Sequence, residues 1–170
     1  SAGAGKLQQW TVTVGDQQSA ASSDTTSYTA PAISGLSGLL SFKTDGTDSA
    51  LVTITGTNFG VDDGENDAIA VYQNADLISA YAKGEFTARD CAVSVAHTEI
   101  TCKPASAGAG KDQAWKVTVG DQQSAASSDT TSYTVPAIDS FNPGSFPTVA
   151  ATAVTITGTN FGVAETANAI

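Results

Sequence analysis

The chain has 170 residues and carries 7 basic against 17 acidic residues, which gives a net charge of −10 at neutral pH. Such a surface repels phosphate backbones, so the charge argues against nucleic-acid binding. The sequence also has no apolar run long enough to cross a bilayer, which argues against membrane insertion. Serine and threonine supply 18 and 23 residues, and this excess of small, polar and β-favouring side chains favours strands over helices.

Alternating apolar and polar residues predict short strands along the chain. In chain order they cover residues 10–14, 52–56, 68–73, 77–81, 91–95, 99–103, 115–119 and 154–158. Gly, Pro, Asn and Asp separate these segments at intervals typical of a β-sandwich. We therefore expect an all-β domain of about seven strands.

The chain repeats its own first segment. Residues 106–138 match residues 1–33 at 29 of 33 positions, an offset of 106 − 1 = 105 residues. The motif VTITGTNFGV stands at 52–61 and again at 154–163, an offset of 154 − 52 = 102, so the connector before the second motif is three residues shorter. A period of about 105 residues is the size of one small domain.

The strand pattern also predicts core positions. Alternation places the two tryptophans on the inward face of their strands, which favours core packing over stacking against a sugar. Phenylalanine in the TNFG turn, between residues that tolerate positive φ, is expected to plug the end of the core. The expected core residues are Trp10, Trp115, Phe59, Phe161, Val52 and Ile54.

The two cysteines are expected to form a disulfide. A hairpin centred between Ala96 and His97 places Cys91 directly opposite Cys102, and directly opposed residues lie within disulfide range. The same register pairs residue 93 with 100 and residue 95 with 98. Two free buried thiols are the less favoured alternative, and two cysteines with one histidine give too few ligands for zinc. A disulfide implies an oxidising, extracellular compartment.

The motif VTITGTNFG, preceded by the Pro-containing stretch IDSFNP at 138–143, resembles the IPT/TIG family of immunoglobulin-like domains. The Cys-containing stretch at 91–108 is similar to the family's hairpin, and WKVTVGDQQS…YTV is similar to its last two strands. The family occurs in plexins, in some transcription factors and in large surface proteins. The resemblance implies head-to-tail seven-stranded sandwiches: a C-terminal part of one domain at 1–33, a complete domain at 34–138 and an N-terminal part of the next at 139–170.

An acidic loop offers a candidate calcium site. Its oxygen donors are Asp62, Asp63, Glu65 and Asp67. A solvated acidic turn is favoured, because the second copy keeps only one acidic residue, Glu165. The only histidine, His97, is expected in an exposed turn, and nothing marks a nucleophile or an oxyanion site. We expect no enzymatic activity and no cofactor.

The Ser/Thr-rich tracts are open to two readings, polar strand faces or O-glycosylation. No Asn-x-Ser/Thr sequon is present. The candidate O-glycosylation residues are Ser22, Ser23, Thr25, Thr26, Ser127, Ser128, Thr130 and Thr131.

The near-identity of the copies, exposed segments included, favours a structural repeat of an extracellular fibre, stalk or surface filament. Its partner is then the same protein, head to tail, with covalently attached glycans as a further candidate. A covalent array within a longer chain is favoured over joining by strand addition. Two alternatives stay open: an adhesive or ligand-binding module of a cell-surface receptor, and an accessory domain of a secreted carbohydrate-active enzyme.

Overall fold

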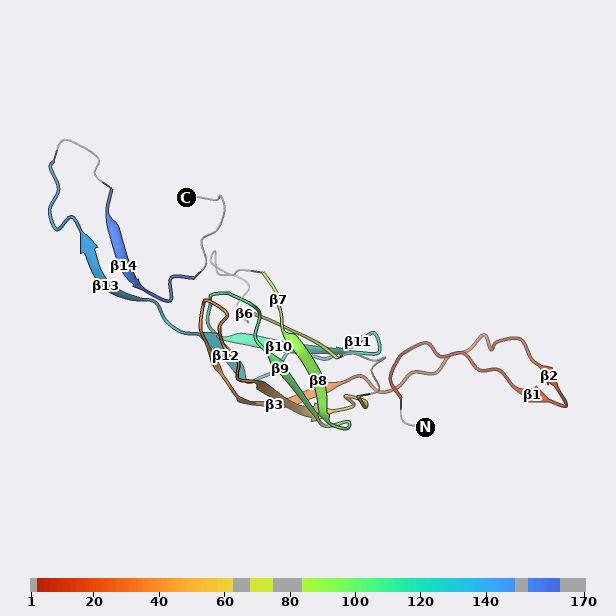
Figure 1. Ribbon diagram of the computed structural model, residues 1–170. Helices are drawn as coiled ribbons and strands as arrows, with labels where there is room; N and C mark the ends of the chain where they lie inside the picture. The colour runs from red at the N-terminus through yellow and green to blue at the C-terminus, as the bar shows by residue number, and fades with distance from the viewer. Residues whose placement is uncertain (1–2, 63–67, 75–83, 149–152, 163–170) are drawn as a thin grey trace.

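The computed structural model describes residues 3–62, 68–74, 84–148 and 153–162, and every regular element in these ranges is a strand (Figure 1). In chain order the strands are β1 Thr13–Val14, β2 Gln17–Gln18, β3 Ala32–Gly38, β4 Ser41–Phe42, β5 Val52–Thr57, β6 Ile69–Asn74, β7 Phe86–Thr87, β8 Arg89–Val95, β9 Glu99–Lys103, β10 Gln113–Val119, β11 Gln122–Gln123, β12 Thr130–Tyr133, β13 Ala137–Asn142 and β14 Thr155–Thr159. The all-β prediction is confirmed. None of the described segments is a helix that could cross a membrane.

Two sheets make up the centre of the molecule. One is antiparallel, in the order β3-β5-β9-β8, and the other has the order β4-β12-β10-β6-β7, with β11 also paired to β10. The second sheet is mixed, because β4 and β12 run parallel while its other pairs are antiparallel. The long β10–β6 ladder pairs Gln113 with Asn74 and Thr118 with Ile69, and so holds the middle of this sheet.

One hydrophobic core draws on both sheets. Its aromatic centre is Trp115, which stacks on Tyr72 at 4.5 Å between ring centroids and meets Phe42 edge-on at 6.3 Å. Aliphatic side chains from the other sheet complete it, and the expected core residues Val52, Ile54, Phe59 and Trp115 are all buried. Every buried hydrophobic residue in the described part of the chain lies between positions 42 and 133.

The predicted disulfide is present. Cys91 on β8 and Cys102 on β9 are bonded, with 4.2 Å between their Cα atoms. Cys102 is fully buried against the core, so the bridge fastens the edge hairpin to the interior.

The hairpin register differs slightly from the prediction. Val93 pairs with Ile100 as expected, but Val95 pairs with Glu99 rather than with Thr98. The physical reason is a register shift between residues 93 and 95, which gives one strand an extra residue before the turn.

The TGTNFG turn behaves as its composition predicts. Asn58 and Gly60 have φ angles of 62° and 76°, in the left-handed region that these residue types tolerate. Gly56 serves another purpose: a Cβ there would collide with the carbonyl oxygen of Ala32 and with the Phe59 ring. The turn therefore needs glycine both for backbone conformation and for close packing.

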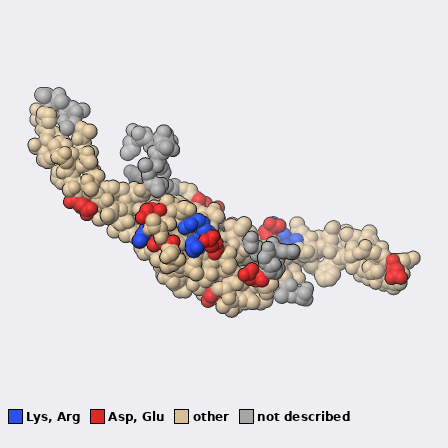
Figure 2. Space-filling model, in the orientation of Figure 1, with Lys and Arg blue, Asp and Glu red and all other residues tan. Residues whose placement is uncertain are grey.

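A hairpin-like segment projects from each end of the central sheets (Figure 1). The N-terminal arm, residues 3–31, contains β1 and β2, and the C-terminal arm, residues 137–148 and 153–162, contains β13 and β14. The visible face of both arms is largely uncharged (Figure 2). The predicted strand at 10–14 forms only over its last two residues, because its counterpart β10 is held by β6 and the N-terminal arm has no such partner among the described residues. The strand predicted at 77–81 lies outside the described residues.

Candidate functional site: the junctions between repeats

The two copies of the repeated segment adopt the same local structure. The indole N–H of Trp115 donates to Thr131 Oγ1 at 2.9 Å, and the indole N–H of Trp10 donates to Thr26 Oγ1 at the same distance. The backbone N–H of each tryptophan donates to a serine hydroxyl, at 2.9 Å and 3.0 Å. The nearly identical sequences therefore make the same hydrogen bonds around the two tryptophans.

The surroundings of the two copies differ completely. Trp115 is 0% exposed, whereas Trp10 is 64% exposed. The prediction that Trp10 and Phe161 are core residues is wrong for this chain, since Phe161 is 52% exposed while its counterpart Phe59 is buried. The reason is topological: the rings of Phe42 and Tyr72 pack on Trp115, and no described aromatic ring packs on Trp10.

Further apolar side chains on both arms are exposed where their counterparts are buried. On the N-terminal arm these are Val12, Val14 and Tyr28, against Val117, Val119 and Tyr133. On the C-terminal arm they are Phe146, Val154 and Ile156, against Phe42, Val52 and Ile54. Each arm thus presents half of a core without the other half.

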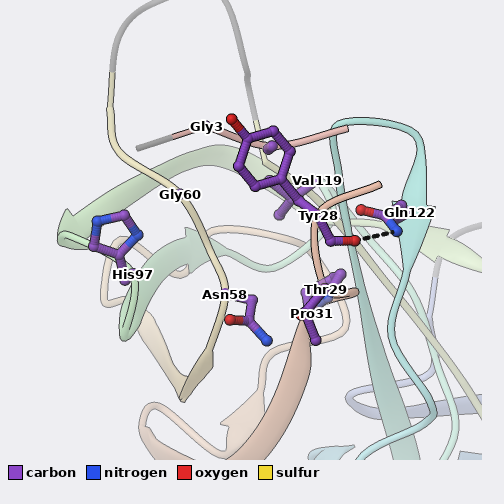
Figure 3. A pocket seen from close by; sticks show the side chains of 10 residues that line it. Gly3, Tyr28, Thr29, Pro31, Asn58, Gly60, His97, Val119 and Gln122 are labelled. Atoms are coloured by element: carbon purple, nitrogen blue, oxygen red, sulfur yellow. Dashed lines mark hydrogen bonds between the residues drawn. The ribbon is translucent and has the colours of Figure 1, made fainter. Parts of the chain in front are cut away.

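The N-terminal arm joins the central sheets at a small cavity of about 230 Å³ (Figure 3). Gln122 Nε2 donates to the carbonyl oxygen of Tyr28 at 2.9 Å, and Asn58 Nδ2 donates to the carbonyl oxygen of Ala30 at 3.0 Å. His97, exposed in its turn as predicted, lies on the opposite wall of the cavity, where its backbone N–H donates to Gly60 O at 2.6 Å. We call this contact the first junction.

The first junction depends on close backbone approach. A Cβ on Gly120, in the turn between β10 and β11, would lie 2.5 Å from the backbone N of Gly5 and 2.9 Å from the Ala4 Cβ. Ala4 packs against the hydrophobic core and Gly5 is buried. The counterpart of Gly120 is Gly15, at the tip of the N-terminal arm, where a Cβ would meet no described atom within 4 Å.

An equivalent site at the other end of the central sheets is open. A groove of about 450 Å³ is lined by Ala109, Tyr133, Thr134, Pro136 and Asn160, the counterparts of first-junction residues 4, 28, 29, 31 and 58. Asn160 Nδ2 donates to the carbonyl oxygen of Val135 at 3.2 Å, as Asn58 does to that of Ala30. We call this groove the second junction.

Corresponding residues differ in burial between the two junctions. Pro31 and Gly5 are buried at the first junction, while Pro136 and Gly110 are exposed at the second. The first junction is closed by Val119 and Gln122 of the central sheets. No described residue takes the corresponding place at the second junction.

Polar groups inside the core serve structure. The hydroxyls of Tyr72 and Tyr133 are 2.8 Å apart, and the Ala105 N–H donates to Tyr72 Oη at 2.9 Å. Burial raises the pKa of both hydroxyls above their usual range. These groups stay neutral at physiological pH. Their mutual hydrogen bond joins β6 to β12 within one sheet, and the bond from Ala105 ties the segment after β9 to that sheet.

The other predicted site residues are dispersed. Of the candidate calcium loop, only Asp62 is described, and Asp63, Glu65 and Asp67 lie outside the described residues. Across the described part of the chain, no group of three or more His, Cys, Asp or Glu residues could hold a metal ion.

The O-glycosylation candidates divide by burial. Ser127 and Thr131 are buried and hydrogen-bonded to Trp115, so these two predictions are wrong. Thr130 and Ser22 are partly buried. The remaining candidates are exposed: Ser23, Thr25, Thr26 and Ser128.

Sequence reasoning did not single out the junction residues Tyr28, Gly120 and Gln122. One signal was available, because the turn residues GDQQ are unchanged between the two copies. Comparison with protein-family models, with curated proteins and with solved structures found no match to this chain.

Proposed function

We propose that this chain is a non-enzymatic structural repeat of an extracellular fibre, stalk or surface filament, built from tandem immunoglobulin-like domains of the IPT/TIG type. The observation that carries the proposal is the pair of half-cores on the two arms. Each arm exposes the side chains that the central sheets bury, in the same local frame. Repetition of one domain along an axis accounts for both arms and for the matched junctions.

The exposed apolar surface supports assembly over a solitary role. Monomeric proteins rarely expose contiguous apolar patches unless these serve an interface. A contact between two different ends of the same unit is heterologous, and when it does not close into a ring it builds an open filament. The disulfide between Cys91 and Cys102 is consistent with an extracellular setting.

Electron microscopy of the purified protein tests the proposal. We expect fibres with an axial repeat of about 35–50 Å per domain, the length of a sandwich of this size with its loops. Discrete particles of one chain at high protein concentration contradict the fibre and favour a receptor module or an accessory domain.

Intact-mass spectrometry tests glycosylation separately. We expect a mass above the 17.1 kDa of the bare polypeptide if glycans occupy the exposed tract residues Ser23, Thr25 or Ser128. A mass equal to the bare value removes the glycans from the proposal and leaves the fibre untouched.

A further inference from the structure

The C-terminal arm has the backbone arrangement of the strands that cover the core in the central sheets. In β13 and β14, Phe141 pairs with Ile156, and in β3 and β5 the counterparts Leu36 and Ile54 pair in the same way. Both pairs of strands carry a register shift at the matching position, between Ile138 and Ser140 and between Ile33 and Gly35. The arm is therefore already folded as one half of a domain.

The N-terminal arm repeats the sequence of β10, β11 and β12, the strands on which residues of β3 and β4 pack in the central sheets. In the central sheets, Asp129 Oδ2 accepts the N–H of Leu36 at 3.1 Å, and Phe42 on β4 pairs in parallel with Tyr133 on β12. Two backbone bonds fix this pair of strands, from Ser132 N–H to Leu40 O at 3.0 Å and from Thr134 N–H to Phe42 O at 2.7 Å.

For each of these contacts, the two partner residues have counterparts elsewhere in the chain, one on the N-terminal arm and one on the C-terminal arm. Asp24 corresponds to Asp129 and Phe141 to Leu36. The dipeptide Ser145-Phe146 corresponds to Ser41-Phe42, and Ser27-Tyr28 to Ser132-Tyr133. The two arms project from opposite ends of the molecule, so they do not meet within one chain (Figure 1).

We propose that the arms are the two halves of an interface between copies of this chain, in which residues 139–148 and 153–162 of one copy cover the Trp10 face of the next copy. This inference rests on the proposed function, since it specifies the joint between fibre units. Phe146 of the first copy then lies against Trp10 and Tyr28 of the next, as Phe42 lies against Trp115 and Tyr133. Asp24 of the next copy accepts the Phe141 N–H of the first.

The same docking completes the second junction. When the N-terminal arm of the next copy lies on the C-terminal arm of the first, its tip reaches the open groove beside Ala109 and Pro136. Gly15 then approaches Ala109 and Gly110 as Gly120 approaches Ala4 and Gly5.

The side chains that close the first junction also have counterparts on the arm's tip. Val14, 73% exposed, corresponds to Val119, and Gln17 corresponds to Gln122, whose amide donates to the Tyr28 carbonyl. In the docked pair Gln17 donates to the carbonyl of Tyr133. A single docking event thus buries both the apolar side chains of the two arms and the residues of the second junction, which argues for a second copy of this chain as the occupant.

The interface is smaller than a complete core. Tyr72, which stacks on Trp115, has no counterpart among residues 139–162, so Trp10 is covered from the Phe146 side. The strand β6 is likewise without a counterpart among the described residues of the C-terminal arm. A reversible, concentration-dependent contact is expected.

Cysteine cross-linking between two variants tests the inference. Because Ser41 and Ser132 are directly paired, Ser27 of one copy lies beside Ser145 of the other, within the range of a disulfide. The variants Ser27→Cys and Ser145→Cys are prepared separately, mixed and oxidised mildly. We expect a cross-linked dimer that contains one chain of each variant, and a ladder of oligomers from the double variant.

The matched control replaces Ser27→Cys by Thr11→Cys, because in the central sheets the counterpart of Thr11, Lys116, pairs with Val71 of β6 and not with β4. Lys116 stays partly exposed there. The inference is overturned if the mixture of Ser27→Cys and Ser145→Cys gives no mixed dimer, or if Thr11→Cys cross-links to Ser145→Cys equally well.

Electron microscopy of the unmodified chain in parallel separates the two proposals. Fibres without the mixed dimer overturn this joint but keep the proposed function, because an array that continues covalently also forms fibres. A mixed dimer without fibres supports the joint and contradicts the fibre.

Discussion

Replacing Trp115 and Trp10 by alanine, one at a time, compares one side chain in two environments. Both indoles donate to a threonine hydroxyl at 2.9 Å, and both stand in a WxVTV segment. Trp115 is fully buried and stacks on Tyr72, so its truncation leaves a cavity in the core. Such truncations cost about 3–5 kcal/mol of unfolding free energy.

Trp10→Ala is expected to cost far less. With 64% of the side chain exposed, only about a third of its surface is buried, and a proportional share of the truncation cost is roughly 1 kcal/mol. The arm contributes none of the buried hydrophobic residues in the described chain, so unfolding of the core is expected to sense even less. The two variants therefore differ by about 3 kcal/mol in the central unfolding transition.

Urea denaturation measures both variants, followed by the signal of the remaining tryptophan and by circular dichroism. The protein must be dilute, because assembly through the arms would bury Trp10. Equal destabilisation by Trp10→Ala and Trp115→Ala at a dilution where the chain is monomeric refutes the reasoning, since it would mean that Trp10 is buried within a single chain.

Three further outcomes follow from the same structure. Replacing both Cys91 and Cys102 by alanine should lower the free energy of unfolding by about 3 kcal/mol, since the bridge closes a loop with a sequence separation of 11; a loss below about 1 kcal/mol in urea would contradict this. Burial raises the pKa of Tyr133, so the neutral hydroxyl stabilises the fold fully below about pH 10, and this stability is lost as pH rises further. Tyr133→Phe should therefore reduce the fall of the unfolding free energy at alkaline pH. An unchanged dependence of the unfolding free energy on pH would count against this prediction. Gly120→Ala and Gly15→Ala carry the same φ strain, at 53° and 51°, yet only Gly120→Ala meets the backbone of the N-terminal arm, so only it should speed proteolysis of that arm; equal rates would remove the junction contact.

The strands of the central sheets could be predicted from the sequence because their alternation is strong and local. Residues 52–57, 99–103 and 113–119 alternate clearly, and the burial pattern of β10 follows the predicted face. The disulfide could be predicted for a similar reason, since the turn between Cys91 and Cys102 is short enough for the register to be read directly. The one-residue shift before Val95 could not, because a bulge is decided by packing against β9.

Burial of the repeated segment could not be predicted from the sequence. Trp10 and Trp115 stand in nearly identical segments, and alternation assigns both to the same inward face. The two tryptophans differ in exposure because Phe42 and Tyr72 pack on Trp115, and these two residues stand far from Trp115 in the chain. Solvent exposure is a property of tertiary contacts, which local periodicity does not contain.

The candidate site shows the same division. The sequence by itself determined that a domain-sized unit recurs, that its strands alternate and that its turns need Gly and Asn, because these depend on short-range sterics and on local hydrophobic pattern. Only the tertiary structure decided which copy is buried, and it placed Gly120 against Gly5 at a closed junction while leaving Gly15 and Pro136 open. Those contacts join segments that are distant in the chain, and the free energy that selects them comes from surfaces that exist only after the sheets have formed.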